Sequence, residues 1–281
     1  METADLAEIK DKLQEGRPFS VGTPDGFFSI TLRSCQPVIG TSIHAGHGTL
    51  DALISELALS EAERLYEEDP YTDQFIAQLP LSIVAHVSRY QGDLNRSPEK
   101  CIYDEAWGKQ VWRNGVSAAD QAQIKAYHQS YYELLDLVLG VINQQFNKSV
   151  LYDLHSYNYS RHQGVPPLFN IGTHHIDLKH YGDFLDSLLT RLADIEIPGM
   201  VNRSVFDELF VGKGYQAEFI KKKHPKTLCI PLEVKKVFMD EFSGDCNQEV
   251  MAGLKMQLDK IFAAYGELFI KQYVDIDSPG A

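Results

Sequence analysis

Short apolar segments alternate with longer amphipathic segments along this sequence, and this alternation restricts the possible fold more than any other feature. The short segments are rich in β-branched and aromatic residues and lie between turn-forming residues, as buried strands do. They are residues 27–34, 37–44, 81–88, 149–155, 168–172 and the first part of 227–239. Apolar residues at helical spacing predict helices over 60–68, 118–146, 176–194 and 247–273. Together they predict a three-layer α/β/α fold with a mixed, largely parallel sheet.

The composition is that of an ordinary globular protein, because 44% of the 281 residues are hydrophobic and 23% are charged. A chain of this length buries a large core as one unit. We therefore expect a single α/β domain over residues 1–281, with a loose N-terminal segment. Ser60 and Ser117 each precede a predicted helix with an acidic residue three positions later, which is typical of an N-cap.

The chain is acidic, with 39 acidic and 26 basic side chains and a net charge of −13. This balance opposes binding to phosphate backbones and anionic lipid, and the short basic run 221–224 is interpreted as a helix end or loop. No stretch approaches the ~18 consecutive apolar residues of a membrane span, and residues 1–18 lack a signal-peptide core. We expect a cytoplasmic protein with a small-molecule partner and neither a nucleic-acid nor a membrane partner. The sequence does not indicate an oligomeric state.

Several common site signatures are absent from the sequence. Its four cysteines form no C-x-x-C pair and no disulfide-like spacing, so no thiolate zinc site is indicated. There is also no G-x-S-x-G elbow, no P-loop and no G-x-G-x-x-G fingerprint. The sequence therefore lacks the motifs that usually indicate a serine hydrolase, a nucleotide hydrolase or a dinucleotide oxidoreductase.

Polar residues stand where several predicted strands end. His44, Arg89, His155 and Glu233 each close or follow an apolar strand. In α/β sheets, ligands bind at the carboxyl ends of the strands. This coincidence is the main reason, from the residues alone, to expect an enzyme.

Two of these strand ends carry histidines. His44 and His47 form the sequence H-A-G-H, and zinc favours imidazole ligands; a surface turn with two histidines is the alternative. His155 ends a strand in which Asp153 points to the same face, so that the carboxylate can orient the imidazole. The alternative is a partly buried histidine whose hydrogen bonds go to the backbone.

Two further charged positions suggest a catalytic site. Glu233 lies inside an apolar strand, where a carboxylate is costly to bury unless it is paired or functional. It is a candidate general base, or else it faces solvent from an edge strand. Arg96 follows Asn95 and offers a planar fork that suits a substrate carboxylate, and its alternative is a structural Arg–Asp pair.

Taken in order, these motifs resemble the N-formylglutamate amidohydrolase family, which is related in fold to the zinc carboxypeptidases. The resemblance covers about residues 37–241. The matching pieces are His44-Ala45-Gly46, Thr72-Asp73, Ser88-Arg89-Tyr90, Asp93-Leu94-Asn95-Arg96, Tyr127-His128, Asp153-Leu154-His155-Ser156, Phe169-Asn170-Ile171-Gly172-Thr173 and Leu232-Glu233-Val234. It implies a zinc exopeptidase-like fold and a Zn²⁺ cofactor.

The resemblance also implies the metal ligands. His44 and His155 are similar to the two histidine ligands. The carboxypeptidases have a liganding Glu three residues after the first histidine, whereas this chain has His47 there. The third ligand is then His47 or a carboxylate from elsewhere, and Asp73, which matches the aspartate of the family's Thr-Asp motif, is favoured.

The same resemblance implies roles in hydrolysis of an N-acyl amino acid such as N-formylglutamate. Glu233 is similar to the general base, and Asn95 and Arg96 are similar to the pair that grips a substrate carboxylate. Arg89 polarises the scissile carbonyl or joins that grip. Gln74 stands where the family often has Trp, so the acyl group and the amino acid are not specified. The alternatives are a carboxypeptidase-like peptidase and a metal-free binding protein.

Overall fold

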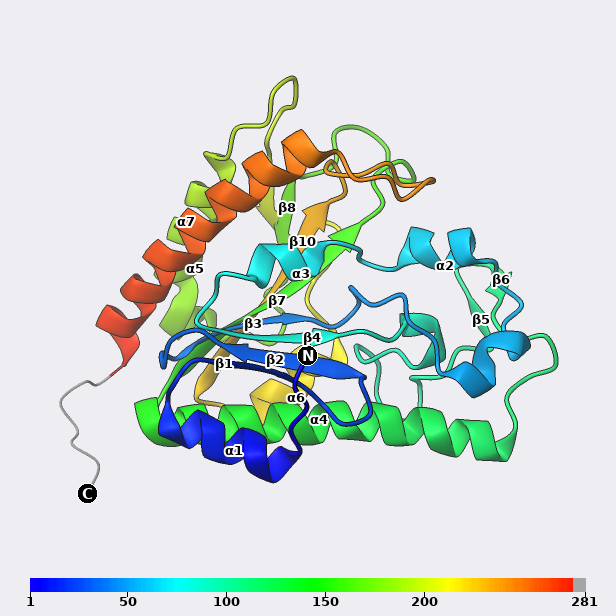
Figure 1. Ribbon diagram of the computed structural model, residues 1–281. Helices are drawn as coiled ribbons and strands as arrows, with labels where there is room; N and C mark the ends of the chain where they lie inside the picture. Colours follow the sequence, from blue (N-terminus) through cyan, green and yellow to red (C-terminus); the bar gives the residue numbers. More distant parts are fainter. Residues whose placement is uncertain (275–281) are drawn as a thin grey trace.

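The computed structural model describes residues 1–274, and its centre is a mixed eight-stranded sheet (Figure 1). The strand order is β1-β2-β4-β3-β7-β10-β8-β9. The strands are β1 (Phe19–Gly22), β2 (Phe28–Leu32), β3 (Val38–Ser42), β4 (Leu81–Ala85), β7 (Ser149–Tyr157), β8 (Phe169–Ile171), β9 (Ser204–Phe206) and β10 (Thr227–Lys235). The central strands β4, β3, β7 and β10 are parallel, and β1, β2 and β8 add the antiparallel pairings.

Helices cover both faces of the sheet (Figure 1). One face carries α1 (Leu6–Glu15), α4 (Ala118–Phe146) and α6 (Tyr215–Lys223), and the other carries α3 (Thr72–Ile76), α5 (Leu178–Ala193) and α7 (Gln248–Tyr273). The predicted three-layer α/β/α fold with a largely parallel mixed sheet is confirmed. The remaining elements are α2 (Glu61–Glu67), the 3₁₀ helices η1 (Asp51–Glu56) and η2 (Arg89–Gln91), and the hairpin of β5 (Glu105–Ala106) and β6 (Lys109–Gln110).

Two hydrophobic cores lie on opposite sides of the sheet, because successive residues of a strand point to opposite faces. On β7, Leu151 packs into the core under α4, while Tyr152 packs into the core under α7. Asp153 and His155 continue the row of Leu151, beyond the point where its apolar residues end. The strand itself therefore directs two polar side chains to one end of the sheet.

The N-terminal residues are not loose, contrary to the sequence-based expectation. Asp5 caps α1 in a capping box with Glu8, and Gly16 ends the helix in the left-handed conformation. Ile9 and Leu13 are fully buried in the core under α4. Only these two apolar residues of α1 are fully buried, with Leu6 packed beside them, and this is a weak pattern in a polar, charged sequence.

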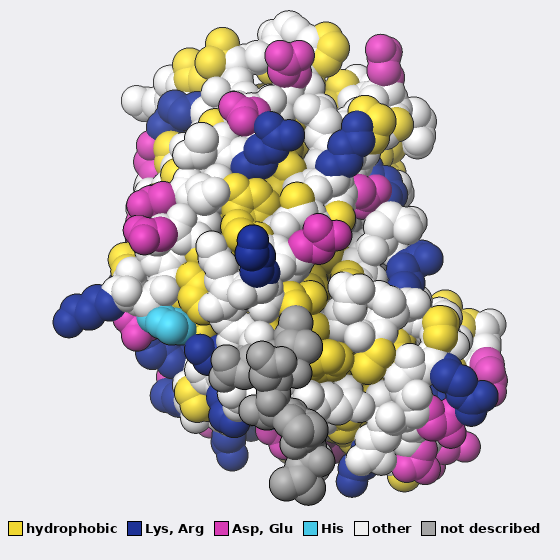
Figure 2. All heavy atoms as spheres, turned by 90° about the vertical axis from the view of Figure 1, so that its left-hand side faces the viewer, with side chains coloured by type: hydrophobic (Ala, Val, Ile, Leu, Met, Phe, Trp, Pro, Cys, Tyr) yellow, Lys and Arg dark blue, Asp and Glu magenta, His cyan; other side chains and the backbone are white. Residues whose placement is uncertain are grey.

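Predicted helix starts at Ser60 and Ser117 are confirmed, because each hydroxyl accepts a hydrogen bond from the N3 backbone. The surface formed largely by α5 and α7 intersperses hydrophobic side chains with charged ones (Figure 2). Over residues 1–274, no helix has both the length and the apolar character that crossing a membrane requires.

Candidate functional site

A cavity of about 450 Å³ opens at the carboxyl ends of β3, β7 and β10. His44 lies two residues beyond β3, while His155 and Glu233 stand near the ends of β7 and β10, and all three line the cavity. This is where parallel α/β sheets bind ligands. The structure thus brings together three residues that the sequence placed at three separate strand ends.

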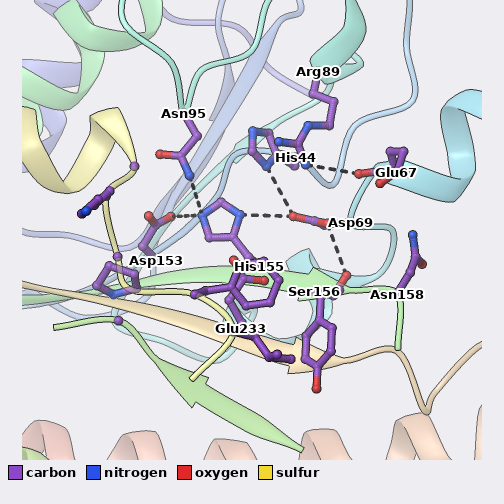
Figure 3. Close-up of a pocket in the computed structure, with 18 of the residues that line it drawn as sticks. His44, Glu67, Asp69, Arg89, Asn95, Asp153, His155, Ser156, Asn158 and Glu233 are labelled. Atoms are coloured by element: carbon purple, nitrogen blue, oxygen red, sulfur yellow. Dashed lines mark hydrogen bonds and ion pairs between the residues drawn. The ribbon is translucent and has the colours of Figure 1, made fainter. Parts of the chain in front are cut away.

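His44, Asp69 and His155 form a buried cluster in which the ligand atoms lie within 4.8 Å of one another (Figure 3). Asp69 Oδ2 lies 3.1 Å from His155 Nδ1 and 3.4 Å from His44 Nδ1. His44 Nδ1 is buried and has no hydrogen-bond partner among the described residues. A buried nitrogen with no partner is costly, and two imidazoles with a carboxylate are a donor set that zinc prefers. The cluster therefore fits a metal ion.

Carboxylates hold the outer nitrogen of each histidine. His44 Nε2 lies 2.9 Å from Asp93 Oδ1, and His155 Nε2 lies 3.1 Å from Asp153 Oδ1. A ligating histidine usually donates its other ring N–H to such a group, which fixes the ring and leaves the inner nitrogen free for the metal. The Nδ1 atoms of both rings therefore face Asp69.

The local field of the cluster is strongly negative. Burial by itself lowers the pKa of His155, but Asp153 and Asp69 raise this pKa well above its usual range. Burial likewise raises the pKa of Asp69, but the nearby imidazoles of His155 and His44 lower this pKa below its usual range. A field that holds a proton on His155 also attracts a metal cation to the same place.

The backbone positions Asp69 next to His44. Its N–H donates to the carbonyl of His44 at 2.9 Å, and its carbonyl accepts from Thr72 Oγ1 at 2.7 Å. Thr72 in turn shares a hydrogen bond with Ser42 at the end of β3. The connection between α2 and α3 is thereby tied to β3, so Asp69 and His44 are fixed to each other.

Asp73, the predicted third ligand, is not part of this cluster. Tyr71 has a φ of 68° and turns the chain into α3, so Asp69 before the turn faces the histidines. Asp73 lies within α3, where burial raises its pKa and the opposing charge is that of His86. His47 is also outside the cluster, because its Nδ1 pairs with Glu68.

The sequence offered one signal for Asp69 that our interpretation missed. Asp69 follows directly after the predicted helix 60–68 and stands before Pro70, so it had to lie in a loop. We assigned no role to it from the sequence. Nothing in the spacing relates a loop carboxylate to two distant strand ends, and the structure alone shows that they meet.

Glu233 lies beside His155, because β10 and β7 pair in parallel with these two residues in register. The Glu233 side chain is partly exposed to the cavity and otherwise enclosed by protein. Burial raises its pKa to about 8, while His155 opposes this shift. In residues 1–274 its carboxylate makes no side-chain hydrogen bond that would fix it as a structural group.

Arg89 contacts the carboxylate behind His44. Its Nε and one terminal nitrogen donate to Asp93 Oδ2 at 3.1 and 2.8 Å, and its other terminal nitrogen donates to the carbonyl of Glu67 at 3.2 Å. Three of the five N–H donors of the guanidinium are therefore occupied. The group also lies 5.0 Å from the ring centroid of Trp107, which is 41% exposed and lines the cavity.

Asn95 and Arg96 both line the cavity. Asn95 Nδ2 lies 3.5 Å from His155 Nε2, and its Oδ1 accepts from the N–H of Gln216 in the first turn of α6. Gly214 permits this contact, because a Cβ there would lie 2.1 Å from Asn95 Oδ1. Arg96 is exposed, and its one described side-chain partner is Tyr103 at 3.4 Å, so its charge is not neutralised by a carboxylate.

The cavity is also lined by three cationic residues that the sequence analysis did not single out: Arg161, Lys213 and Lys236. Arg161 pairs with Glu67 at 2.7 Å. Lys236 is almost completely buried and donates to backbone carbonyls. Lys236 follows the motif Leu232-Glu233-Val234 closely, but Arg161 and Lys213 lie in loops, and only the folded chain shows that all three reach the cavity.

Comparison with known proteins places this site in a family. The sequence model described as N-formylglutamate amidohydrolase matches residues 36–237, which is more than half of the chain. No curated protein sequence matches this one.

Among solved structures, N-formylglutamate amidohydrolase from Ralstonia eutropha JMP134 superposes with a TM-score of 0.70 and 17% identity, covering 87% of this chain and 98% of that chain. A gene product of Agrobacterium tumefaciens superposes with a TM-score of 0.64 and 14% identity, covering 86% and 96%. Carboxypeptidase A from Helicoverpa armigera is a more distant match, with a TM-score of 0.48 and 10% identity over 96% and 75%.

Proposed function

This chain belongs to the N-formylglutamate amidohydrolase family, and we propose that it is a zinc-dependent hydrolase that cleaves the amide bond of an N-acyl amino acid. N-formylglutamate is the first candidate substrate. The observation that carries the metal dependence is the cluster of His44, Asp69 and His155, in which His44 Nδ1 is buried and has no hydrogen-bond partner within residues 1–274. The family match supports the amide hydrolysis.

His44, Asp69 and His155 would hold the ion, with Asp93 and Asp153 fixing the two imidazoles from behind. Zinc bound by three protein ligands keeps a position open and acts as a Lewis acid on water and on a carbonyl oxygen. The negative field of the cluster is the complement of such a cation.

Glu233 acts as the proton carrier of the reaction. Its carboxylate stands beside His155 at the cavity, and no side-chain hydrogen bond from the described part of the chain holds it. A cation held at the cluster would favour the ionised form of Glu233, which would take a proton from the attacking water as the water oxygen bonds to the acyl carbon. It then gives a proton to the amide nitrogen as the C–N bond breaks, so that the products are a carboxylic acid and an amino acid. A positioned general base of this kind contributes roughly 100- to 10,000-fold to the rate.

Asn95 and Arg96 hold the carboxylate of the amino-acid part, because Arg96 has an unneutralised charge at the cavity and Asn95 lies beside His155. A guanidinium recognises a carboxylate with two parallel hydrogen bonds. Arg89 also lines the cavity, and two of its N–H donors have no partner among residues 1–274, so they are left to polarise the scissile carbonyl.

A second candidate is a carboxypeptidase-like peptidase that uses the same residues. The cavity of about 450 Å³ has room for more than a formyl group, and Trp107 offers an exposed aromatic surface at its edge. A longer acyl chain or a peptide would use this surface.

The test combines metal analysis with substrate profiling. Purified protein is assayed for zinc and then for release of the amine from N-formylglutamate, N-acetylglutamate and a dipeptide with a C-terminal glutamate. We expect about one zinc per chain and fastest turnover of an N-acyl amino acid. A protein that neither contains nor takes up a transition metal contradicts the proposal, and a preference for the dipeptide favours the peptidase.

A further inference from the structure

The C-terminal end of α2 is held by cations from the cavity wall. Lys236 Nζ donates to the carbonyls of Tyr66 at 2.9 Å and Glu68 at 2.7 Å. Arg89 donates to the carbonyl between them, that of Glu67, at 3.2 Å. The last carbonyls of a helix have no partner within the helix and carry its negative partial charge. Three consecutive carbonyls are thus satisfied by two positive side chains.

Lys236 is an unusual residue to find in this place. It is the first residue after β10, it is only 1% exposed, and it lines the cavity. Burial lowers its pKa to about 8, against the opposing effect of the nearby carboxylates Asp69 and Glu67. Placing an ammonium group there is costly unless its geometry is needed, and no carboxylate within residues 1–274 forms an ion pair with it.

The residue that follows these carbonyls is Asp69. Its backbone is fixed on the C-terminal side by Thr72 and through its N–H by the carbonyl of His44. On the N-terminal side lies Glu68, its immediate neighbour, whose side chain accepts from Ser88 and pairs with His47. The backbone carbonyl of Glu68 is held by the ammonium of Lys236. Without it, the end of α2 would lose the bond that ties it to β10, the strand that carries Glu233.

We propose that Lys236 is a positioning residue that fixes the α2–α3 connection to the end of β10 and thereby holds Asp69 in place as a metal ligand. This inference rests on the proposed metal site. It assigns a role to a buried lysine that touches neither the ion nor the substrate. Residues that hold ligands in place typically contribute about 10- to 100-fold to metal affinity.

The test measures zinc affinity by competition with a chromophoric chelator, on the full chain without substrate. We expect Lys236→Met to bind zinc about 10- to 100-fold more weakly than wild type, with an unchanged circular dichroism spectrum of the metal-free protein. Lys235→Met is the matched control: this neighbour points to the other side of β10, where its Nζ lies 4.5 Å from the ring centroid of Tyr159. It should bind zinc as wild type does.

Chemical rescue separates the charge of Lys236 from its volume. Lys236→Ala lacks a propylammonium group next to an open cavity, so added propylammonium should restore zinc affinity, while propanol should not. Equal rescue by both compounds, or wild-type affinity in Lys236→Met, overturns the inference. So does a Lys236→Ala variant that remains unfolded with propylammonium present, since the lysine would then support the fold rather than the ligand. If the wild-type protein binds no zinc, the proposed metal site itself is wrong. That result is distinguishable from the outcomes above, which concern only the role of Lys236.

Discussion

The site is built from two regions that are held by different means. Asp153, His155 and Glu233 stand on β7 and β10, adjacent strands at the centre of the sheet, and the strand register sets their spacing. Asp69, Arg89, Asp93 and Asn95 stand in loops after α2 and β4, and these residues are held by side-chain contacts with one another and with nearby carbonyls.

The difference shows where the stability of the site is located. The strand region is built into the two cores, so its side chains keep their places as long as the sheet is intact. The loop region depends on a chain of charged contacts, in which Asp93 alone receives hydrogen bonds from Arg89, Tyr103 and the N–H of Asn95. Loops on a rigid scaffold commonly carry function in this manner, and we expect changes in the two regions to have different consequences.

The largest effect is expected from His155→Ala, which removes a proposed ligand from the strand region. The variant should fold, because His155 lies beyond the apolar rows of the two cores, but it should bind no zinc and show no turnover. His128→Ala is the control, since it also removes a buried imidazole but one whose Nε2 bonds to the carbonyl of Arg96. Zinc analysis after dialysis against equimolar metal measures both. Zinc retained by His155→Ala would remove this residue from the ligand set.

Glu233→Gln tests catalysis within the same region. The amide is nearly isosteric but cannot accept the proton from water, so kcat should fall by about 100- to 10,000-fold while zinc content and KM stay close to wild type. Glu241→Gln is the control, because Glu241 is also buried but accepts hydrogen bonds from the N–H of Ser160 outside the cavity. If Glu233→Gln keeps full turnover, another group is the base.

The same contrast explains what the sequence could predict. The strand region follows from period-two alternation: residues 149–155 and the first part of 227–239 were predicted as strands, and both carried a polar residue on a definite face. Alternation within a strand does not predict the register between two strands, so the pairing of Glu233 with His155 is seen only in the folded sheet. The short helices α1, α3 and α6 were not predicted, because they bury few apolar residues each.

The loop region was predicted less well. Arg89, Asn95 and Arg96 line the cavity. The carboxylate that meets the two histidines is Asp69, whereas the resemblance favoured Asp73 as the third ligand. Asp69 and Asp73 are four positions apart in sequence, and the left-handed turn at Tyr71 lies between them. A non-glycine residue rarely adopts that conformation, so the turn that selects Asp69 has no clear signal in the sequence.

Asp69→Asn tests the loop region directly. Removing a charged ligand should weaken zinc binding by more than the ~10- to 100-fold that follows loss of a residue behind the ligands. Asp73→Asn, four residues away, should bind zinc as wild type does. If a metal titration shows that Asp73→Asn binds zinc more weakly than Asp69→Asn, then Asp73 is the third ligand, as the sequence resemblance favoured.

Arg96→Ala should act on substrate and leave the metal in place. Losing a charge-assisted hydrogen bond costs about 1.5–3 kcal/mol, so KM for an N-acyl amino acid should rise about 10- to 100-fold at unchanged zinc content. Arg161→Ala is the comparison, because Arg161 lines the same cavity but is already neutralised by Glu67. An equal rise in KM for both variants would mean that the cavity attracts the substrate by its general charge, and loss of zinc from Arg96→Ala would make Arg96 structural.

The smallest effects are expected from two matched variants, one in each region, that each remove a single hydroxyl. Tyr103 donates its hydroxyl to Asp93, the carboxylate behind His44, and Thr41 donates its hydroxyl to Asp153, the carboxylate behind His155. Tyr103→Phe and Thr41→Val each remove one hydroxyl at nearly constant shape. Because Asp153 is held by the backbone of β7, Thr41→Val should weaken zinc binding by no more than about twofold. Tyr103→Phe should weaken zinc binding by about 3- to 10-fold. That loss is a fraction of the ~1.5–3 kcal/mol that a hydrogen bond to a charged group contributes. Isothermal titration of the metal-free proteins measures both values. If Thr41→Val has the larger effect, the strand region is not the more rigid of the two. Asp153 would then be held through the hydroxyl of Thr41, which also accepts a hydrogen bond from Gln216.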